Sequence, residues 1–358
     1  MSTAPPGEDY NNEDEGIIPM TPGVQIPAAI GLAILILISI TGNSMTVIAY
    51  LRDQRLCTVY DFYLFQLGIT DLLLSAISLP FYTVYTLMEF TWPFGYAFCK
   101  IYLVCDFTLC FQSIMLMLII SLDRLLLIQM GHSYMIKITR RVGVAQVVCA
   151  WLISFLVFSP AIIGWDAWVG YSTVKNMDCD VEFAYDRVFT TITAFVEFLI
   201  PFVCMTSLNA LIYVKIKQRS KVNPSTSSHV QSASSINPGN RTGIANALPP
   251  AARDPGGRHR KAAKFLAMLV VAFLIFWAPY SITTVLISFC DDCVNTSLYE
   301  FFNFFLWMKS AVNPFLYAYN SPRYRMHFRR FLTFNGRLLL RTKEPSVEPE
   351  ITVQTSAM

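Results

Sequence analysis

Residues 99–125, CKIYLVCDFTLCFQSIMLMLIISLDRL, form an apolar run long enough to cross a lipid bilayer as a single helix. The run carries a carboxylate, Asp106, in its first third and the charged pair Asp123-Arg124 near its end. Asp106 and Arg124 are 18 positions apart, which is five helical turns or about 27 Å, so both side chains leave the same face. Charge at membrane depth is costly and is normally retained for function. The stretch therefore predicts a membrane helix with an ionic site at each end.

The composition of the whole chain supports an integral membrane protein. Of its 358 residues, 54% are hydrophobic and only 14% are charged, which is too apolar for a soluble domain of this length. Seven stretches are long enough to span a bilayer: 27–51, 61–86, 97–122, 142–165, 188–214, 261–289 and 299–319. The segment SPRYRMHFRRFL that follows alternates basic and apolar residues, as in an amphipathic interfacial helix. We predict an all-α membrane protein, a seven-transmembrane helix bundle over 27–332 with a short amphipathic helix after the seventh span.

The distribution of charge predicts the orientation of the bundle. Residues 1–26 are acidic and contain no lysine or arginine, whereas basic residues gather after the first span and on the same side thereafter. The positive-inside rule makes that side cytoplasmic. We expect an extracellular N-terminal tail over 1–26, a cytoplasmic tail over 333–358 and location in the plasma membrane. The Ser-, Pro- and Gly-rich stretch of about 216–259 predicts a disordered third cytoplasmic loop.

Four of the nine cysteines fall on the predicted outer side, where disulfides persist. Cys99 with Cys179 and Cys290 with Cys293 are the pairings we expect, and four free thiols are the alternative. The sequon at Asn295 faces the outer side but lies close to the membrane, so it is a weak prediction for glycosylation.

Further polar residues interrupt the spans. Asp71 lies in the middle of the second span, and Glu197 lies one turn before Pro201 in the fifth. A lone carboxylate at this depth faces a bundle interior and needs a partner. Pro80 is expected to kink the second span and turn Tyr82 and Tyr85 inward, although both tyrosines could equally pack against lipid or the core.

The sixth and seventh spans also combine prolines with polar and aromatic side chains. In the sixth, Pro279 bends the helix beside Trp277 and Tyr280. The seventh carries four notable residues in order: Lys309, Asn313, Pro314 and Tyr317.

Taken in order, these motifs resemble the rhodopsin-like G-protein-coupled receptors over about residues 30–332. The resemblance is carried by Gly42-Asn43, Asp71, Asp123-Arg124, Trp151, Pro201, Phe276-Trp277-Ala278-Pro279 and Asn313-Pro314-Phe315-Leu316-Tyr317. It implies a receptor that signals through a heterotrimeric G protein and is regulated by arrestin and kinases. It also implies a conformational switch formed by Asp123, Arg124, Pro279, Asn313, Pro314 and Tyr317.

Asp106 in the third span is similar to the residue that binds the ligand ammonium in aminergic receptors. Other residues most resemble histamine receptors of the third and fourth types, namely Tyr82, Phe107, Cys110, Glu197, the Trp277–Tyr280 motif and Trp307. The resemblance implies a histamine receptor with inhibitory (Gi/o-type) coupling. A receptor for another monoamine, or an orphan receptor of aminergic type, is the alternative.

The chemistry of the two carboxylates agrees with this implication. Asp106 and Glu197 are costly to leave uncompensated, and a ligand with an ammonium at one end and a donor at the other satisfies both. Histamine has that form. Tyr82, Tyr85, Tyr280, Phe107 and Trp307 are expected to supply aromatic walls for the cation.

Two departures from the family pattern concern the switch. Leu125 follows Arg124 where the family has an aromatic residue, and the sixth span begins with Arg258-His259-Arg260 in place of an acidic residue. Arg124 is then left with Asp123 as its only evident partner. We expect a weak resting lock and appreciable basal signalling.

A third departure concerns the internal ion site at which Asp71, Ser113 and Asn313 would hold sodium in relatives. Lys309 stands one turn before Asn313, and we expect its ammonium to pair with Asp71 in place of the ion. Extension of Lys309 elsewhere is the alternative.

Other functional classes fit less well. An opsin lysine would lie where this chain has Trp307. A retinal site also needs one counter-ion, whereas Asp106 and Glu197 supply two. All four histidines fall on predicted cytoplasmic loops or edges, no Gly-rich phosphate loop is present, and inverted repeats are absent from the pattern. We therefore expect neither an enzyme nor a transporter, and no cofactor, metal or nucleic acid.

Overall fold

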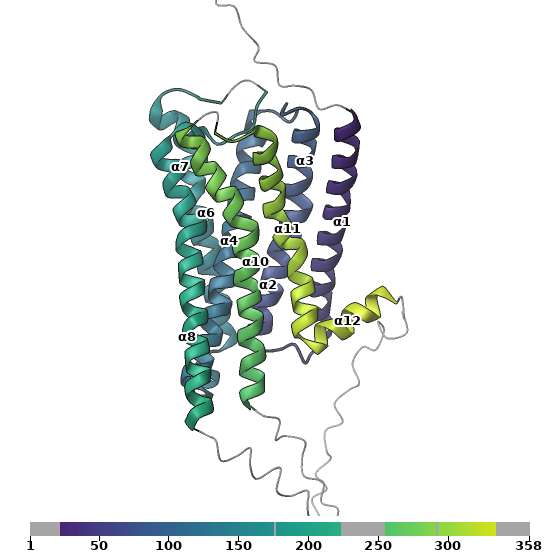
Figure 1. Ribbon diagram of the computed structural model, residues 1–358, viewed down its shortest axis with the longest axis vertical. Helices are drawn as coiled ribbons and strands as arrows, with labels where there is room; N and C mark the ends of the chain where they lie inside the picture. Colours follow the sequence, from purple (N-terminus) through teal and green to yellow (C-terminus); the bar gives the residue numbers. More distant parts are fainter. Residues whose placement is uncertain (1–21, 175–176, 223–254, 291–292, 334–358) are drawn as a thin grey trace, which may run out of the picture.

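The computed structural model describes residues 22–174, 177–222, 255–290 and 293–333. Long helices stand side by side through the described part of the chain, which contains no strand (Figure 1). The long helical units are α1 (Pro22–Arg52), α2–η1–α3 (Val59–Leu73, Leu74–Ser78 and Leu79–Leu87), α4 (Tyr96–Met130), α6 (Arg140–Val169), α7–η3–α8 (Arg187–Ala194, Phe195–Leu199 and Ile200–Val222), α10 (Pro255–Phe289) and α11 (Thr296–Asn320). Short helices are α5 (His132–Lys137), η2 (Glu182–Tyr185) and α12 (Pro322–Leu332).

Each predicted span coincides with one of these long helical units. Six of them are both long and apolar enough to cross a membrane. The seventh unit, α11, is less apolar because it carries Glu300, Asn303, Lys309 and Asn313. These polar residues turn out to lie at the interior contacts described below.

Helices continue past the apolar runs on both sides of the predicted third loop. Residues 216–222 extend α8 and residues 255–259 begin α10, so the interval between these helices is shorter than the stretch of about 216–259. Lysine, glutamine and arginine in 216–222 are good helix formers, and extending an existing helix requires no new nucleation. Likewise α1 begins at Pro22 rather than at residue 27, with proline in a favoured first-turn position. The predicted tails and the centre of the third loop lie outside the described residues.

Helix α4 occupies the middle of the bundle. It packs against α2, α6, α8 and α10, whereas α11 packs against α1 and α10. Asp106 and Arg124 both lie on this continuous helix, so α4 joins the two ionic sites that the sequence predicted.

Two π-helical turns precede prolines in the outer part of the bundle. The turn η1 comes just before Pro80, and η3 comes just before Pro201 and contains Glu197. Proline has no N–H for the usual helical bond, so a wider turn accommodates it. The kink predicted at Pro80 therefore takes the form of a π turn, and the same device sets the direction of Glu197.

The predicted amphipathic helix is α12, which runs to the side of the bundle after α11 (Figure 1). Its apolar face buries Tyr324 and Phe328. His327 Nε2 lies 2.9 Å from the Asp53 carboxylate, which ties α12 to the end of α1.

Candidate ligand-binding site

Asp106 on α4 and Glu197 in η3 are the two carboxylates around which the site is built. Glu197 is 8% exposed and Asp106 is half-buried. The two groups lie close enough for their charges to act on one another. Within the described residues, neither has an ion-pair partner. The structure thus brings together the two residues that the sequence singled out and leaves both anions without a cation.

Aromatic and sulfur-containing side chains surround this pair. Cys110 Sγ lies 4.0 Å from a carboxylate oxygen of Asp106. The Phe107 ring lies 5.5 Å from that of Phe158 on α6 and 6.2 Å from that of Phe183 in η2. Phe158 and Phe183 belong to the buried core of the protein, and Phe107 packs against that core.

Tyr82 and Tyr85 have their hydroxyl groups held by acidic residues that the sequence analysis did not single out. The Tyr82 hydroxyl donates to Glu300 on α11 over 2.7 Å and accepts from Asn303 over 2.6 Å. The Tyr85 hydroxyl donates to Asp178. These bonds fix the faces of both rings within the bundle, so packing against lipid is excluded as their main role.

The aromatic residues of α10 and α11 complete the cluster. The Trp307 ring packs edge-on against Tyr82 at 4.9 Å, and the Tyr280 ring lies 5.8 Å from that of Tyr299. Trp277 is 3% exposed and packs on Phe273 below this level.

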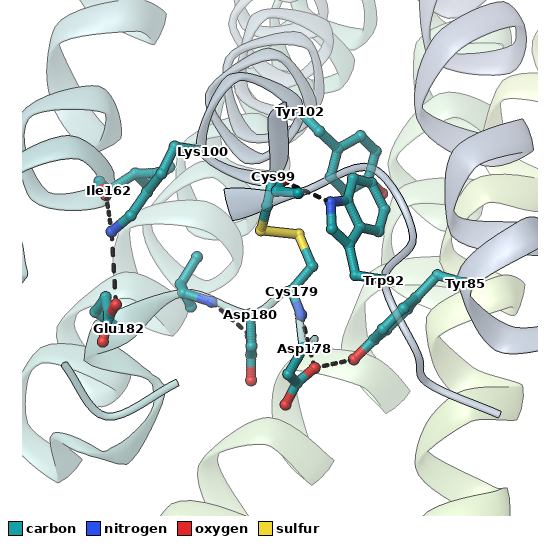
Figure 2. The surroundings of a disulfide bond; sticks show 12 residues. Tyr85, Trp92, Cys99, Lys100, Tyr102, Ile162, Asp178, Cys179, Asp180 and Glu182 are labelled. Atoms are coloured by element: carbon teal, nitrogen blue, oxygen red, sulfur yellow. Dashed lines mark hydrogen bonds and ion pairs between the residues drawn. A yellow bond between two sulfur atoms is a disulfide. The ribbon is translucent and has the colours of Figure 1, made fainter. Parts of the chain in front are cut away.

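The loop between α6 and α7 is fastened to the top of α4. Figure 2 shows the disulfide between Cys99 and Cys179, one of the two expected pairings. The side chains of Asp178 and Asp180 on either side of Cys179 both extend away from the disulfide (Figure 2). The charge of Asp180 acts on Tyr280, Tyr299 and Glu300, so this exposed carboxylate lies near the aromatic cluster.

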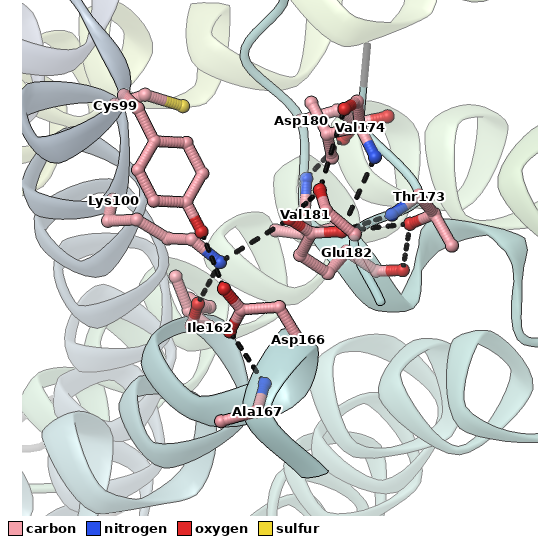
Figure 3. Close-up of polar contacts among 12 residues, drawn as sticks. Cys99, Lys100, Ile162, Asp166, Ala167, Thr173, Val174, Asp180, Val181 and Glu182 are labelled. Carbon is pink, nitrogen blue, oxygen red and sulfur yellow. Dashed lines mark hydrogen bonds and ion pairs between the residues drawn. The ribbon is translucent and has the colours of Figure 1, made fainter. Parts of the chain in front are cut away.

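A second fastening lies deeper in the same loop. Glu182 accepts hydrogen bonds from Ser172 and Thr173, and the ammonium of Lys100 lies 3.7 Å from it (Figure 3). The Lys100 ammonium also donates to the carbonyl of Ile162 over 2.9 Å. Burial alone would raise the pKa of Glu182, but these hydrogen bonds and the lysine charge outweigh it, so the pKa is lowered. Glu182 is therefore a satisfied structural carboxylate, unlike Asp106 and Glu197.

The second expected disulfide joins Cys290 to Cys293 between α10 and α11. Just after it, Asn295 is exposed and caps α11 by accepting from the backbone of Ser297 over 2.8 Å. The weak glycosylation prediction at Asn295 stays a prediction.

A polar centre lies halfway along α4. Asp71 accepts from Ser113 over 3.0 Å, from Ser310 over 3.2 Å and from Asn313 over 2.6 Å. Lys309 is 4% exposed, and its ammonium donates to Ser113 over 2.7 Å. The expected pairing of Lys309 with Asp71 stays a prediction, since the two charges act on one another but no direct contact joins them in the described structure. One hydroxyl group stands between the two charges, because the lysine side chain reaches across to α4 rather than to α2.

The Arg124 end of α4 also differs from expectation. Arg124 donates to Asp123 from Nε over 2.8 Å and from Nη2 over 2.6 Å. Its guanidinium carbon also lies 3.7 Å above the ring of Tyr60 on α2, and Tyr134 donates to Asp123 over 2.9 Å. Asp123 is therefore not the only partner of Arg124. Tyr60 was missed because a lone tyrosine at a span end carries no sequence signal.

The remaining predicted switch residues lie on α10 and α11. Pro279 leaves α10 continuous, and its carbonyl accepts from Thr283 over 2.8 Å. Pro314 lies against Gly42 of α1, where an added Cβ would meet the proline ring at 3.0 Å. Tyr317 is 1% exposed and lies between Phe265 and Tyr324.

Comparison with known proteins places this arrangement in context. The family model described as 7 transmembrane receptor (rhodopsin family) matches residues 42–317. The chain is 28% identical over 397 residues to the histamine H4 receptor of Mus musculus, covering 95% of this chain and 98% of that protein. The histamine H4 receptor of Rattus norvegicus is 27% identical over 387 residues, with 92% and 96% covered. The muscarinic acetylcholine receptor M1 of Mus musculus is 25% identical over 401 residues, with 84% and 87% covered.

Proposed function

This chain belongs to the rhodopsin family of seven-transmembrane receptors, and we propose that it is a histamine receptor with inhibitory G-protein coupling. The family and its relatives make it a multi-pass plasma-membrane receptor of aminergic type, and not an enzyme. Family membership and these relatives imply a small amine ligand and coupling to a G protein. Histamine and the inhibitory class of G protein are the finer parts of the proposal.

The observation that carries the choice of histamine is the pair of carboxylates, Asp106 and Glu197, that have no ion-pair partner among the described residues. Burying an anion without a partner is costly, so a ligand that supplies two donors gains free energy at both ends. The histamine ammonium pairs with Asp106, and its imidazole N–H donates to Glu197. The α4 and η3 positions of these groups suit a small ligand that lies across the bundle.

Other amines match only part of this arrangement. Acetylcholine, the ligand named for the muscarinic relatives, is a quaternary cation with no N–H to give Glu197. Catecholamines present hydroxyl groups that hydroxyl side chains would bind, whereas η3 offers a glutamate one turn before Pro201. The ammonium of Lys309 donates to Ser113 in the polar centre, which gives a retinal linkage no support.

Acidic residues beside the aromatic cluster favour a cationic ligand as well. Asp178 and Glu300 accept from Tyr85 and Tyr82, and the charge of Asp180 acts on Tyr280. Negative charge near a binding site raises the association rate of cations. The end of the bundle that carries Asp178 is extracellular in our proposal. Cys99 lies near the start of α4, and Cys290 directly follows α10, which ends on the side of the bundle where α1 begins (Figure 1). Disulfides at these places agree with an oxidising exterior.

The proposed mechanism is a binding switch. Histamine bridges Asp106 and Glu197 and draws η3 toward α4, which changes the space around Trp277 on α10. The cytoplasmic end of α10 then moves outward, and Arg124 becomes available to the G protein. A ligand can drive this change only by binding the active state more tightly than the resting state.

The test is a panel of biogenic amines applied to cells that express the full chain, read as inhibition of forskolin-stimulated cyclic AMP. We expect histamine to be the most potent amine. The Asp106→Asn variant should lose about a hundredfold or more in histamine affinity at unchanged surface expression, because it removes one partner of a buried charge pair. Retained affinity would contradict the proposal, and so would a stronger response to another amine.

Glu197→Gln separates histamine from monoamines that have no second donor. It should weaken histamine by roughly 10- to 100-fold, the value of one charge-assisted hydrogen bond. Binding of 2-phenylethylamine, which has a ring without an N–H, should change far less. Asp186→Asn is the matched control, since this exposed residue only caps α7 and asparagine caps equally well.

A further inference from the structure

We infer that the Lys309 ammonium is a built-in cation of the polar centre and that this receptor does not take up sodium there. The inference concerns a site apart from the ligand carboxylates, so it stands whether or not histamine is the ligand. It rests on the hydrogen bonds that surround Asp71 and on the position of one buried lysine.

The residues around Asp71 do not fit a sodium ion. Oδ1 of Asp71 accepts from Ser113 and Ser310, and Oδ2 accepts from Asn313. Both carboxylate oxygens are thus already engaged by donors. A sodium ion needs several oxygen lone pairs directed at it, and three of the four lone-pair positions of this carboxylate are directed at hydrogen atoms.

The hydroxyl group of Ser113 is likewise occupied by hydrogen bonds. Its hydroxyl gives its proton to Asp71 and receives one from the Lys309 ammonium over 2.7 Å. A metal ion would have to take the lone pair that the ammonium uses. The buried amide oxygen of Asn313 has no hydrogen-bond partner, but one neutral oxygen cannot replace the hydration shell of a cation.

Charge leads to the same conclusion. Lys309 and Asp71 neutralise each other across a single hydroxyl group, and both are almost wholly buried. A sodium ion bound to Asp71 would lie about 4–5 Å from the ammonium, and repulsion at that distance weakens binding about a hundredfold or more. The centre therefore keeps one fixed cation that does not exchange with the solution.

The test is the unfolding temperature of the purified full-length receptor, followed by tryptophan fluorescence without any ligand. Samples are compared in about 150 mM sodium chloride and in the same concentration of N-methyl-D-glucamine chloride. We expect the wild-type unfolding temperatures to agree in the two salts. A rise of about 2 °C or more in sodium would overturn the inference, since that shift corresponds to a site filled on the native state alone.

Lys309→Asn supplies the positive arm, because it removes the ammonium and adds an amide oxygen. This variant should gain the sodium-dependent rise that the wild type lacks, and the double variant Asp71→Asn/Lys309→Asn should lose it again. A folded Lys309→Asn without a sodium response would contradict the role given to the lysine. If this variant does not fold, the wild-type comparison still decides the question. The readout needs no agonist, so a failed histamine proposal would leave its outcome unchanged.

Discussion

Removal of the Tyr60 ring should raise the activity of the receptor in the absence of ligand. The Arg124 guanidinium lies 3.7 Å above that ring while two of its nitrogens bind Asp123. Tyr134 holds Asp123 from the other side. Arg124 is thus restrained by α2 and by its own helix, and in Tyr60→Ala the restraint from α2 is lost.

The expected size follows from the burial of this contact. A cation over an aromatic ring contributes about 0.5–1 kcal/mol when exposed and about 2 kcal/mol when desolvated. The Arg124 side chain is 18% exposed, so about 1–2 kcal/mol is appropriate. If the contact exists only in the resting state, its loss raises the ratio of active to resting receptor by about 5- to 30-fold.

The assay is binding of a non-hydrolysable GTP analogue to membranes that contain receptor and G protein, with no ligand and with receptor number normalised. Tyr60→Phe keeps the ring and is the matched control, which should remain near the wild type. Basal activity of Tyr60→Ala equal to or below that of Tyr60→Phe would refute the reasoning. Appreciable basal signalling of the wild type stays a prediction. The contact between Tyr60 and Arg124, which the sequence did not reveal, is expected to reduce that basal activity.

Three further predictions concern stability. Glu182→Gln should lower the free energy of unfolding by about 2 kcal/mol. Because the pKa of Glu182 is lowered, the wild type keeps this stability above the ordinary pKa of glutamate and loses it as the pH falls below that value. The difference between the unfolding temperatures at pH 7 and pH 4 should therefore be smaller in the variant than in the wild type. Asp71→Asn and Lys309→Met should each cost about 3 kcal/mol in thermal unfolding, and the double variant should cost clearly less than their sum, since additivity would show that the two charges do not interact. Gly42→Ala should cost about 1–3 kcal/mol because its Cβ would lie 3.0 Å from a proline side chain of α11, whereas Gly31→Ala, with open space around it, should be tolerated.

The fold followed from the sequence because a bilayer permits few structures. Apolar runs of span length must become helices, and every predicted span did. The ends of the helices were less predictable. Outside the bilayer, hydropathy no longer distinguishes helix from loop, so it does not fix where α8 ends or where α10 begins.

The candidate site was predictable to the extent that charge contrasts with an apolar background. Asp106, Glu197 and Lys309 stood out for that reason, and the structure places the first two together. Asp178 and Glu300 did not stand out, because acidic residues near loops are ordinary. Their assignment required the hydrogen bonds to Tyr85 and Tyr82, which depend on tertiary structure.

The structure also narrows how a signal can pass along α4. Asp106, Ser113 and Arg124 lie on one continuous helix, α4. What can change is the contact of α4 with its neighbours, namely Glu197 in the π turn η3 and Lys309 on α11.

Coupling through a shared two-state contact is reciprocal. A variant that breaks the Lys309–Ser113 bond, such as Lys309→Met, should therefore shift agonist affinity and the basal level of G-protein activation in the same direction. A change in one without the other would place the coupling outside the polar centre.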